Sequence, residues 1–166
     1  MTKSKQQIAE ALRTAIRGEE DGFMFYDIMA RKAVNPEARR KLENLRDDEV
    51  RHKRTLHHLY EQYVGGEIGP LPEKGLSVLS EVFRKGQVAQ LKTEMQFISL
   101  AIEAEIATAR FYQTERNLTD DPIFQQVFDR LAEEEHSHFE LLQAEKEALA
   151  GNYSWFSIEG TQPLEH

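Results

Sequence analysis

The chain has 166 residues, of which 40% are hydrophobic and 30% are charged, and its formal net charge is −8 at pH 7. This length suits one compact domain, and the acidic balance argues against nucleic acid and an anionic membrane as partners. The sequence contains no cysteine, which excludes disulfides, cysteine-ligated zinc, iron–sulfur clusters and thiol catalysis. It shows no signal peptide and no apolar run of transmembrane length, so we expect a cytoplasmic protein.

Sparse glycines and prolines divide the chain into long helical segments. The main break is the stretch Gly65–Gly75, which cannot be helical throughout. Asn35-Pro36 and Asp121-Pro122 each place an N-cap residue before a proline at the first helical turn, which is a signal for the start of a helix. The predicted helices span residues 5–33, 36–64, 87–118 and 121–150. We also expect a short helix around Ser77–Lys85.

Each long helix carries an apolar stripe that is interrupted by ionisable residues. In the second helix the stripe runs from Leu42 to Tyr63 in alternating steps of three and four, which is typical of a helix packed in a bundle. All four stripes contain a glutamate, and two of them contain a histidine three residues later. The inward ionisable residues are Glu19, Glu49, His52, Glu105, Glu135 and His138.

The two halves of the chain repeat at one offset without a gap. Glu19 corresponds to Glu105, an offset of 86 residues (105 − 19), and the same offset applies to other features of the pattern. The further matches are Phe25-Tyr26 with Phe111-Tyr112, Pro36 with Pro122, Leu45 with Leu131, Glu49 with Glu135, His52 with His138, and Leu56 with Leu142. The repeat predicts an all-α, up-down four-helix bundle of two helical hairpins over residues 1–150.

The spacing of the glutamates places them at one height in the bundle. Glu19 and Glu49 lie 30 residues apart (49 − 19), with the turn midway between them, and Glu105 and Glu135 are spaced in the same way. Because a helix rises about 1.5 Å per residue, the two glutamates of each antiparallel hairpin face one another. Packing the hairpins stripe to stripe then gathers four glutamates and two histidines.

Such a cluster needs a compensating charge. Burying carboxylates together costs several kcal/mol or more, and the basic residues Arg51, Lys53 and Arg110 lie off the stripes. Two divalent metal ions would balance four carboxylates. Carboxylate with imidazole suits iron, manganese or zinc, and a glutamate from each of two helices with Glu-x-x-His from the other two is a known di-iron ligand set. We therefore predict two iron ions, for which zinc or manganese could substitute.

Four motifs carry a resemblance to a known family: EEDGFMFY, DDEVRH, EIATARFY and EEEHSH, which begin at residues 19, 47, 105 and 133. Over residues 5–150 the chain resembles the rubrerythrin branch of the ferritin-like superfamily. The resemblance implies a ferritin-like bundle and the same six ligands. In this family a ligand glutamate lies seven residues before a tyrosine. Glu19 lies seven residues before Tyr26, and Glu105 lies seven residues before Tyr112. These tyrosines are either core aromatics or hydrogen-bond donors that orient a ligand carboxylate.

The chain departs from that family in two respects. Full rubrerythrins carry a rubredoxin domain with a four-cysteine iron site, so this cysteine-free chain implies a separate electron donor protein. Rubrerythrins also supply a further glutamate about one turn after the one that corresponds to Glu105, where this chain reads Ile106-Ala107-Thr108-Ala109. The second departure argues against rubrerythrin-type peroxidase chemistry and favours a plainer six-ligand site.

Three functions remain open from the sequence. The first is a di-iron oxidoreductase that reacts with dioxygen or hydrogen peroxide, with no catalytic residue beyond the metal ligands. The second is an iron-handling protein with little turnover, and the third is a metal-stabilised interaction module. A homodimer is an open alternative because ferritin-like relatives commonly dimerise.

Several residues are assigned to the surface or to the tail. We expect Asp48 and Glu134, four residues before the histidines, to be solvated rather than bonded to imidazole. We expect His57 and His58 to be surface or dimer-contact residues, and Glu133 and His136 to face outward. In the tail, residues 151–163, Trp155 and Phe156 are expected to pack on the bundle, and residues 164–166 resemble the start of an expression tag.

Overall fold

The computed structural model describes residues 3–151 and Trp155. Its long elements are helices: α1 (Lys5–Lys32), α2 (Pro36–Tyr63), α4 (Glu94–Asn117) and α5 (Pro122–Ala150). A short helix, α3 (Val78–Arg84), and a 3₁₀ helix, η1 (Gln87–Gln90), lie between α2 and α4. None of the helices in the described part of the chain is long and apolar enough to cross a membrane.

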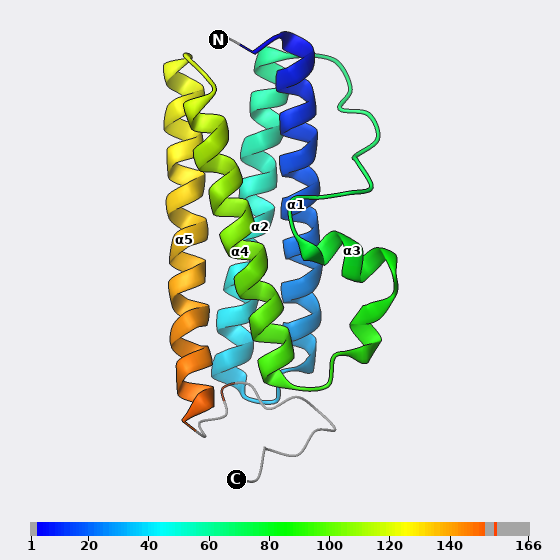
Figure 1. Cartoon of the computed structure of the whole chain (residues 1–166), viewed down its shortest axis with the longest axis vertical. Coiled ribbons are helices and arrows are strands. Elements are labelled where there is room, and N and C mark those ends of the chain that lie inside the picture. The colour runs from blue at the N-terminus through cyan, green and yellow to red at the C-terminus, as the bar shows by residue number, and fades with distance from the viewer. Residues whose placement is uncertain (1–2, 152–154, 156–166) are drawn as a thin grey trace.

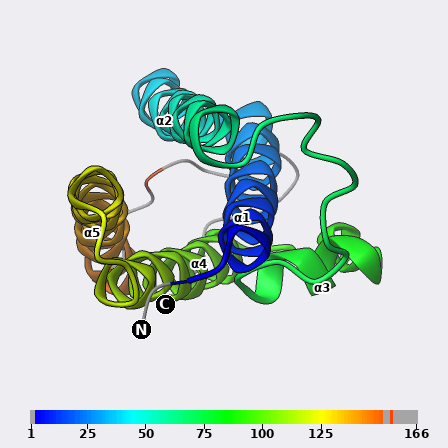
Figure 2. The same cartoon turned by 90° about the horizontal axis from the view of Figure 1, so that it is seen from above.

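The four long helices form a bundle of two antiparallel hairpins, and the segment between them returns along the outside, so that α2 and α4 start at the same end (Figure 1). Most contacts between helices lie within the α1–α2 hairpin and the α4–α5 hairpin, and the hairpins meet through α1 with α4 and α2 with α5. Seen from above, α3 lies outside the bundle, beside α1 and α4 (Figure 2). The prediction of a four-helix bundle built from two hairpins is confirmed.

The helix starts follow from the capping residues that the sequence provides. The Asn35 side chain accepts hydrogen bonds from the backbone N–H groups of Glu37 and Ala38, and Asp121 caps α5 in the same way. In both helices a proline follows the cap, where its missing N–H costs no hydrogen bond. The predicted limits of these two helices and of α1 agree with the structure to within one residue.

The predicted start of the third long helix at residue 87 was wrong. The α-helix begins at Glu94, because Thr93 forms a capping box with Gln96, in which each side chain accepts a hydrogen bond from the other residue's backbone. Before it, Gly86 adopts a left-handed conformation (φ 64°), and the chain makes one 3₁₀ turn. Leu91, which falls inside the predicted helix 87–118, lies between these two helices.

Two apolar clusters occupy the two ends of the bundle. One includes Phe25, Leu42 and Phe97, and the other includes Leu12 and Tyr112, with further residues of all four long helices. The predicted ligand residues lie between these clusters along every long helix, so the polar centre has apolar packing above and below it. Removing these apolar side chains from water supplies the main driving force for folding.

The tail contributes one described residue to the core. Trp155 is buried and belongs to the cluster that contains Phe25, and its backbone N–H donates a hydrogen bond to Glu94 Oε2 over 3.1 Å. The packing role predicted for Trp155 is therefore confirmed. Phe156 and residues 164–166 lie outside the described residues.

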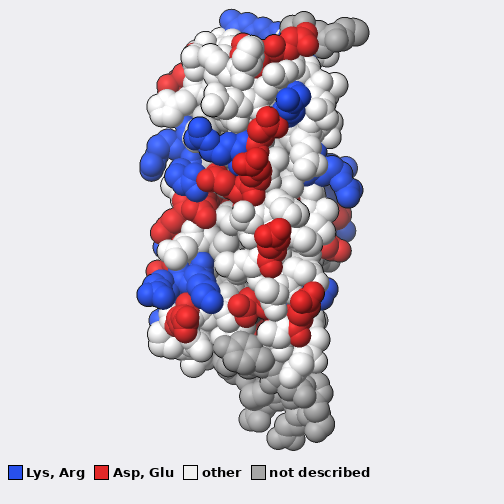
Figure 3. All heavy atoms as spheres, turned by 90° about the vertical axis from the view of Figure 1, so that its left-hand side faces the viewer, with Lys and Arg blue, Asp and Glu red and all other residues white. Residues whose placement is uncertain are grey.

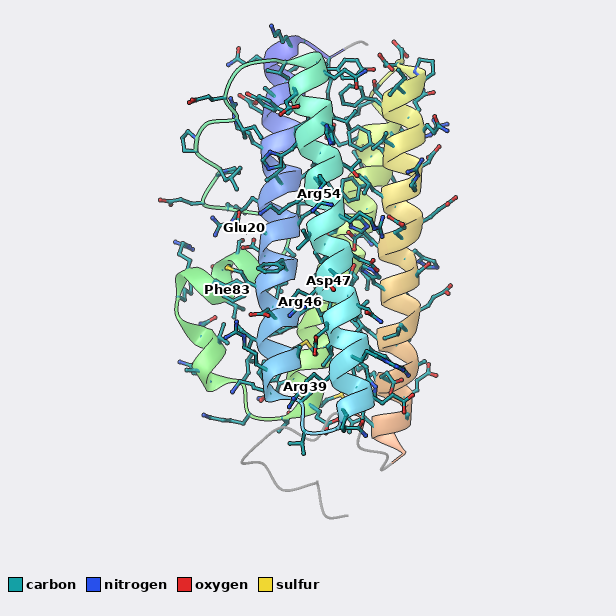
Figure 4. The ribbon with its side chains drawn as sticks, turned by 180° about the vertical axis from the view of Figure 1, so that it is seen from behind. Glu20, Arg39, Arg46, Asp47, Arg54 and Phe83 are labelled. Carbon is teal, nitrogen blue, oxygen red and sulfur yellow. The ribbon has the colours of Figure 1, made fainter. Side chains whose placement is uncertain are left out.

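Charged side chains of both signs cover the outside of the bundle. On the face that carries α5, groups of Lys and Arg lie among groups of Asp and Glu, with uncharged residues between them, as Figure 3 shows. On the opposite side of the molecule from the view of Figure 1, Arg46 of α2 lies near Asp47 (Figure 4) and also donates a hydrogen bond to Asp27 of α1 over 3.0 Å. This pattern matches the interspersed charge of the sequence.

Candidate metal centre

The six residues predicted from the stripes meet in the middle of the bundle. None of them has more than 5% of its surface exposed. They form two overlapping groups in which the ligand atoms lie within 4.8 Å of one another. The first group is Glu19, Glu49, His52 and Glu135, and the second is Glu49, Glu105, Glu135 and His138.

The composition of the two groups follows the internal repeat. Glu49 and Glu135 belong to both groups, so each hairpin supplies one shared carboxylate. The remaining members of each group come from a single hairpin, as Glu19 and His52 do in the first group. The two groups could therefore hold two neighbouring cations, with the two shared carboxylates between them.

The histidines direct different ring nitrogens inward and outward. His52 Nδ1 lies 2.9 Å from Glu135 Oε1 and 3.3 Å from Glu19 Oε2. His138 Nδ1 likewise lies 3.3 Å from Glu49 Oε1, at an angle that makes no hydrogen bond. Nδ1 is therefore the imidazole atom available to a cation at the centre.

Asp48 and Glu134 bind the outward nitrogens, so the prediction that they are solvated was wrong. His138 Nε2 lies 2.9 Å from Asp48 Oδ2, and His52 Nε2 lies 2.8 Å from Glu134 Oε2. Each carboxylate thus pairs with the histidine of the other hairpin rather than with the histidine four residues later on its own helix. Such outer hydrogen bonds fix the tautomer and the orientation of a ligating imidazole.

Arg51 joins the two outer carboxylates. Its Nη1 donates to both oxygens of Glu134 over 3.1 and 3.2 Å, and its Nη2 donates to Asp48 Oδ1 over 3.0 Å. Sequence reasoning placed Arg51 off the stripes and gave it no role. The only signal available was the offset of 86, which relates Asp48 to Glu134 and so marks them as a pair.

The two tyrosines donate hydrogen bonds to the centre. Tyr112 Oη donates to Glu19 Oε1 over 2.5 Å, and Tyr26 Oη donates to Glu105 Oε1. Burial, followed by the charge of the neighbouring carboxylates, raises the pKa of both phenols well above 10, so they keep their protons. Each tyrosine belongs to the hairpin opposite to the carboxylate that it contacts. The hydrogen bonds considered from the sequence are therefore present.

The pKa values of the cluster reflect the burial of several carboxylates close together. Burial and the charges of neighbouring glutamates raise the pKa of Glu49 and Glu135 well above the usual range. Burial also tends to raise the pKa of Glu19, but the hydrogen bond and charge of His52 prevail and lower it to about 2. Burial opposes the charged imidazole of His52, yet its hydrogen bonds to Glu135 and Glu19 raise its pKa to about 11.

The donor set fits divalent metal ions. Glu49 Oε1, Glu135 Oε2 and His138 Nδ1 are buried and make no hydrogen bond, although such groups are normally paired in native structures. The two groups together offer four carboxylates and two imidazoles. A cation bound to each group would satisfy these atoms and offset the carboxylate charge, and oxygen with imidazole ligands suits iron, manganese or zinc.

The register chosen between two overlapping Glu-x-x-His motifs is confirmed. Glu135 and His138 are buried, whereas Glu133 and His136 are exposed. His57 and His58, which were assigned to the surface, are also exposed.

Comparisons with known proteins find chains similar to this one in sequence and in fold. The chain is 30% identical over 127 residues to the uncharacterized protein YhjR of Bacillus subtilis (strain 168). The matched region covers 76% of this chain and 78% of that protein. It also superimposes on the solved structure of the hypothetical protein Pfu-1136390-001 from Pyrococcus furiosus with a TM-score of 0.73 and 24% identity, over 87% of this chain and 90% of that one. This structural likeness concerns the fold alone.

The model of one protein family matches most of the chain. The match covers residues 10–146, which include all four long helices almost entirely and every residue of the two groups. The four-helix bundle and the buried glutamates and histidines at its centre agree with that family's ferritin-like fold. The chain belongs to the rubrerythrin family.

Proposed function

We propose that this chain binds two iron ions through its six buried residues and acts as a non-haem di-iron oxidoreductase that reduces dioxygen or hydrogen peroxide. The observation that carries the proposal is the pair of four-residue groups that share Glu49 and Glu135. Membership of the rubrerythrin family supports iron as the metal. Zinc or manganese could substitute, because the same ligand types suit them.

Each residue of the two groups has a distinct role in the proposal. Glu49 and Glu135 would contact both ions, whereas Glu19 with His52, and Glu105 with His138, would each contact one. When bound, two Fe(II) ions supply the two electrons that, with two protons, reduce one hydrogen peroxide to two waters.

The chain's own residues would hold the ligands in place during this reaction. Tyr112 keeps Glu19 oriented by its hydrogen bond, and Asp48 holds the imidazole of His138 with Nδ1 inward. The apolar clusters on both sides of the centre exclude bulk water from it.

The electrons would come from a separate donor protein, because the chain has no cysteine with which to hold an iron–sulfur or rubredoxin-type relay. A homodimer and a cytoplasmic location are further proposals that depend on the likeness to this family and on the composition of the chain. Its net charge of −8 supports partners other than nucleic acid or an anionic membrane.

Elemental analysis of anaerobically purified protein, followed by stopped-flow mixing with dioxygen and with hydrogen peroxide, tests the proposal. We expect two iron ions per chain, and an absorption change that requires the oxidant and repeats when the protein is reduced again. Iron uptake and release without repeated turnover would assign iron handling instead. A protein that binds no iron under these conditions would refute both functions.

A further inference from the structure

A cavity of about 120 Å³ lies at the end of the bundle where α1 begins and α4 turns into α5, which is the upper end in Figure 1. All four long helices contribute to its wall. An engineered apolar cavity of about 150 Å³ in another protein binds benzene, so this one has room for a small aromatic molecule. The described lining includes none of the six predicted metal ligands, and the cavity is therefore separate from the candidate metal centre.

Aromatic rings form part of the wall. The Tyr63 ring packs edge-on against that of Phe124 with 4.4 Å between the ring centroids, and the Phe124 and Phe128 centroids lie 5.4 Å apart. Ile8 and Leu12 of α1 add aliphatic side chains. Such a wall favours a ligand with an aromatic ring, because burial of apolar surface is favourable and rings pack well edge-on or offset against one another.

Acidic side chains make the cavity attractive to a cation. Glu115 of α4 is buried, and its carboxylate accepts a hydrogen bond from the ammonium of Lys3, which also lines the cavity. Asp121 is a second acid in the lining, and it also caps α5 and accepts a hydrogen bond from the Tyr63 hydroxyl over 3.3 Å. One lysine and two acids give the lining a formal charge of −1 (1 − 2), which favours a cation over an anion.

The internal repeat relates this cavity to the opposite end of the bundle. The offset of 86 connects residues of the lining with residues of the apolar cluster that contains Trp155. The corresponding pairs are Leu12 with Ile98, Tyr63 with Leu149, Glu115 with Met29, Thr119 with Ala33, Phe124 with Ala38, and Phe128 with Leu42. The two ends are therefore built on one plan, and the closed end is a guide to what the open end can hold.

Two differences explain the space at this end. Ala11 in the lining corresponds to Phe97 in the closed cluster, so a methyl group stands where the other end has a ring. The closed cluster also contains the buried Trp155, whose backbone N–H donates to Glu94 Oε2 over 3.1 Å. At the closed end, an aromatic ring and an N–H donor to a carboxylate thus complete the core.

We propose that the cavity binds a small primary ammonium ion that carries one aromatic ring. The ammonium replaces that of Lys3 at Glu115, and the ring packs among the aromatic side chains of the wall. Charged hydrogen bonds are among the stronger ones, and a few polar groups in an apolar pocket fix the orientation of a ligand. This site goes beyond the proposed function and does not rest on it, because it requires no metal ion.

Benzylamine is a suitable probe, because it is a cation at neutral pH and has a single ring. Titration of the full chain, followed by heteronuclear NMR, should show saturable binding with the largest shifts at residues of the cavity. Benzoate has the same ring and the opposite charge, so we expect it to bind at least about tenfold more weakly beside Glu115. Absence of saturable benzylamine binding, or equal affinity for benzoate, would overturn the proposal.

Lys3→Gln tests whether the ligand takes the place of the lysine. The variant removes the ammonium that competes for Glu115, and we expect benzylamine to bind about fivefold more tightly, since a partly exposed ion pair is a modest competitor. Lys5→Gln is the matched control, because it makes the same change of charge at an exposed position two residues later. Equal tightening in both variants would assign the effect to net charge and overturn the displacement of Lys3.

Glu115→Gln removes the acceptor charge while it keeps the shape of the side chain. We expect the affinity for benzylamine to fall about tenfold and that for the uncharged benzyl alcohol to stay as in the parent. Glu103→Gln, at an exposed position of the same helix, should bind both probes as the parent does. Benzylamine affinity that is unchanged in Glu115→Gln would contradict the role of this carboxylate.

A further variant keeps the test independent of how Glu115→Gln folds. Ala11→Leu leaves the ion pair of Lys3 and Glu115 in place and fills part of the cavity, so binding of both benzylamine and benzyl alcohol should be lost. Binding of both probes at the parent affinity would place their site elsewhere and overturn the proposal. All of these titrations can be made on metal-free and on iron-loaded protein, and a failure of the chain to bind iron would leave their outcome unchanged.

Discussion

The two hairpins carry the same predicted metal ligands at the same height but have different surroundings. Each hairpin gives one group its own glutamate and histidine and gives both groups one shared carboxylate. The hydrogen bonds that hold those ligands from outside cross over, as Tyr26 with Glu105 and Asp48 with His138 do. Neither hairpin can therefore build half of the centre alone, because each positions the ligands of the other.

The differences between the hairpins lie one layer further out. The offset of 86 relates Arg51 to Ser137, so a single guanidinium serves outer carboxylates of both hairpins. It also relates Asp21 to Ala107, and only the first of these is a buried acid. The predicted ligands therefore follow the repeat, whereas the residues that hold them from outside do not.

Replacing predicted ligands should have the largest effect, and it should distinguish residues shared by both groups from residues of one group. In Glu135→Gln a carboxylate common to both groups is lost, and we expect both iron ions to be lost. In His52→Gln only one group is affected, so one of the two ions should remain, because the second group keeps all four of its members. Elemental analysis after gel filtration measures both outcomes.

His136→Gln is the control for these variants, because it makes the same change at an exposed position of α5. It should retain both metal ions. Equal metal content in Glu135→Gln and His52→Gln would contradict the division into shared and single-group residues.

Arg51→Gln should have the next largest effect and should act on both hairpins at once. The variant frees Glu134 and Asp48 from a common partner, so both imidazoles lose restraint. Hydrogen-bond partners outside the ligands typically change metal affinity by about 10–100-fold, and we expect about tenfold because Arg51 is one contact further from the metal. Competition with a chromogenic chelator measures the affinity.

Arg54→Gln provides the comparison, since Arg54 is an exposed arginine of the same helix (Figure 4). If it weakened metal binding as much as Arg51→Gln does, the loss would be a general effect of surface charge. The bridge between the hairpins would then have no part in it.

The sequence predicted the bundle and the convergence of six residues because both depend on periodicity. A heptad stripe shows which face of a helix is buried, and the equal spacing around each turn shows the height. These two facts were enough to choose His138 over His136 as the inward residue. The metal-binding role of these residues stays a prediction.

Periodicity could not predict contacts that cross between hairpins. Asp48 lies four residues before His52, and this local spacing concealed its actual contact with His138. Predicting that contact requires knowing how two separate helices, α2 and α5, are rotated about their axes relative to one another. The late start of α4 was missed for another reason. The apolar pattern alone extends this helix back to residue 87, whereas the capping box of Thr93 and Gln96 starts it at Glu94.

Asp21 provides a test of stability that has no counterpart in the second hairpin, where Ala107 takes the equivalent position. Its Oδ1 lies 3.2 Å from Arg17 Nε, while Oδ2 is buried without a hydrogen bond. Burial raises its pKa from 3.8 to about 6, against the opposing charge of Arg17. Between about pH 4 and 6 the folded metal-free protein holds a proton that the unfolded chain has released, so this group's contribution to stability is lost as pH rises.

We therefore expect Asp21→Asn to raise the free energy of unfolding at pH 7 by about 1–3 kcal/mol, with little or no gain at pH 4. Urea unfolding of the metal-free variant and parent at both pH values measures the difference. A gain of equal size at pH 4 and pH 7 would show that the acid's ionisation is not the cause.

The smallest effect should come from the tyrosines, where the two hairpins should respond alike. In Tyr26→Phe and Tyr112→Phe a carboxylate, Glu105 or Glu19, loses its phenol donor while the ring remains. A hydrogen bond to a charged group contributes about 1.5–3 kcal/mol, and we expect less than half of this in the iron-loaded protein, where the metal also holds the carboxylate. Thermal unfolding of both iron-loaded variants measures the loss. Equal losses would show that the crossed hydrogen bonds are interchangeable, whereas a loss confined to one variant would extend the asymmetry of the hairpins to the residues that touch the ligands.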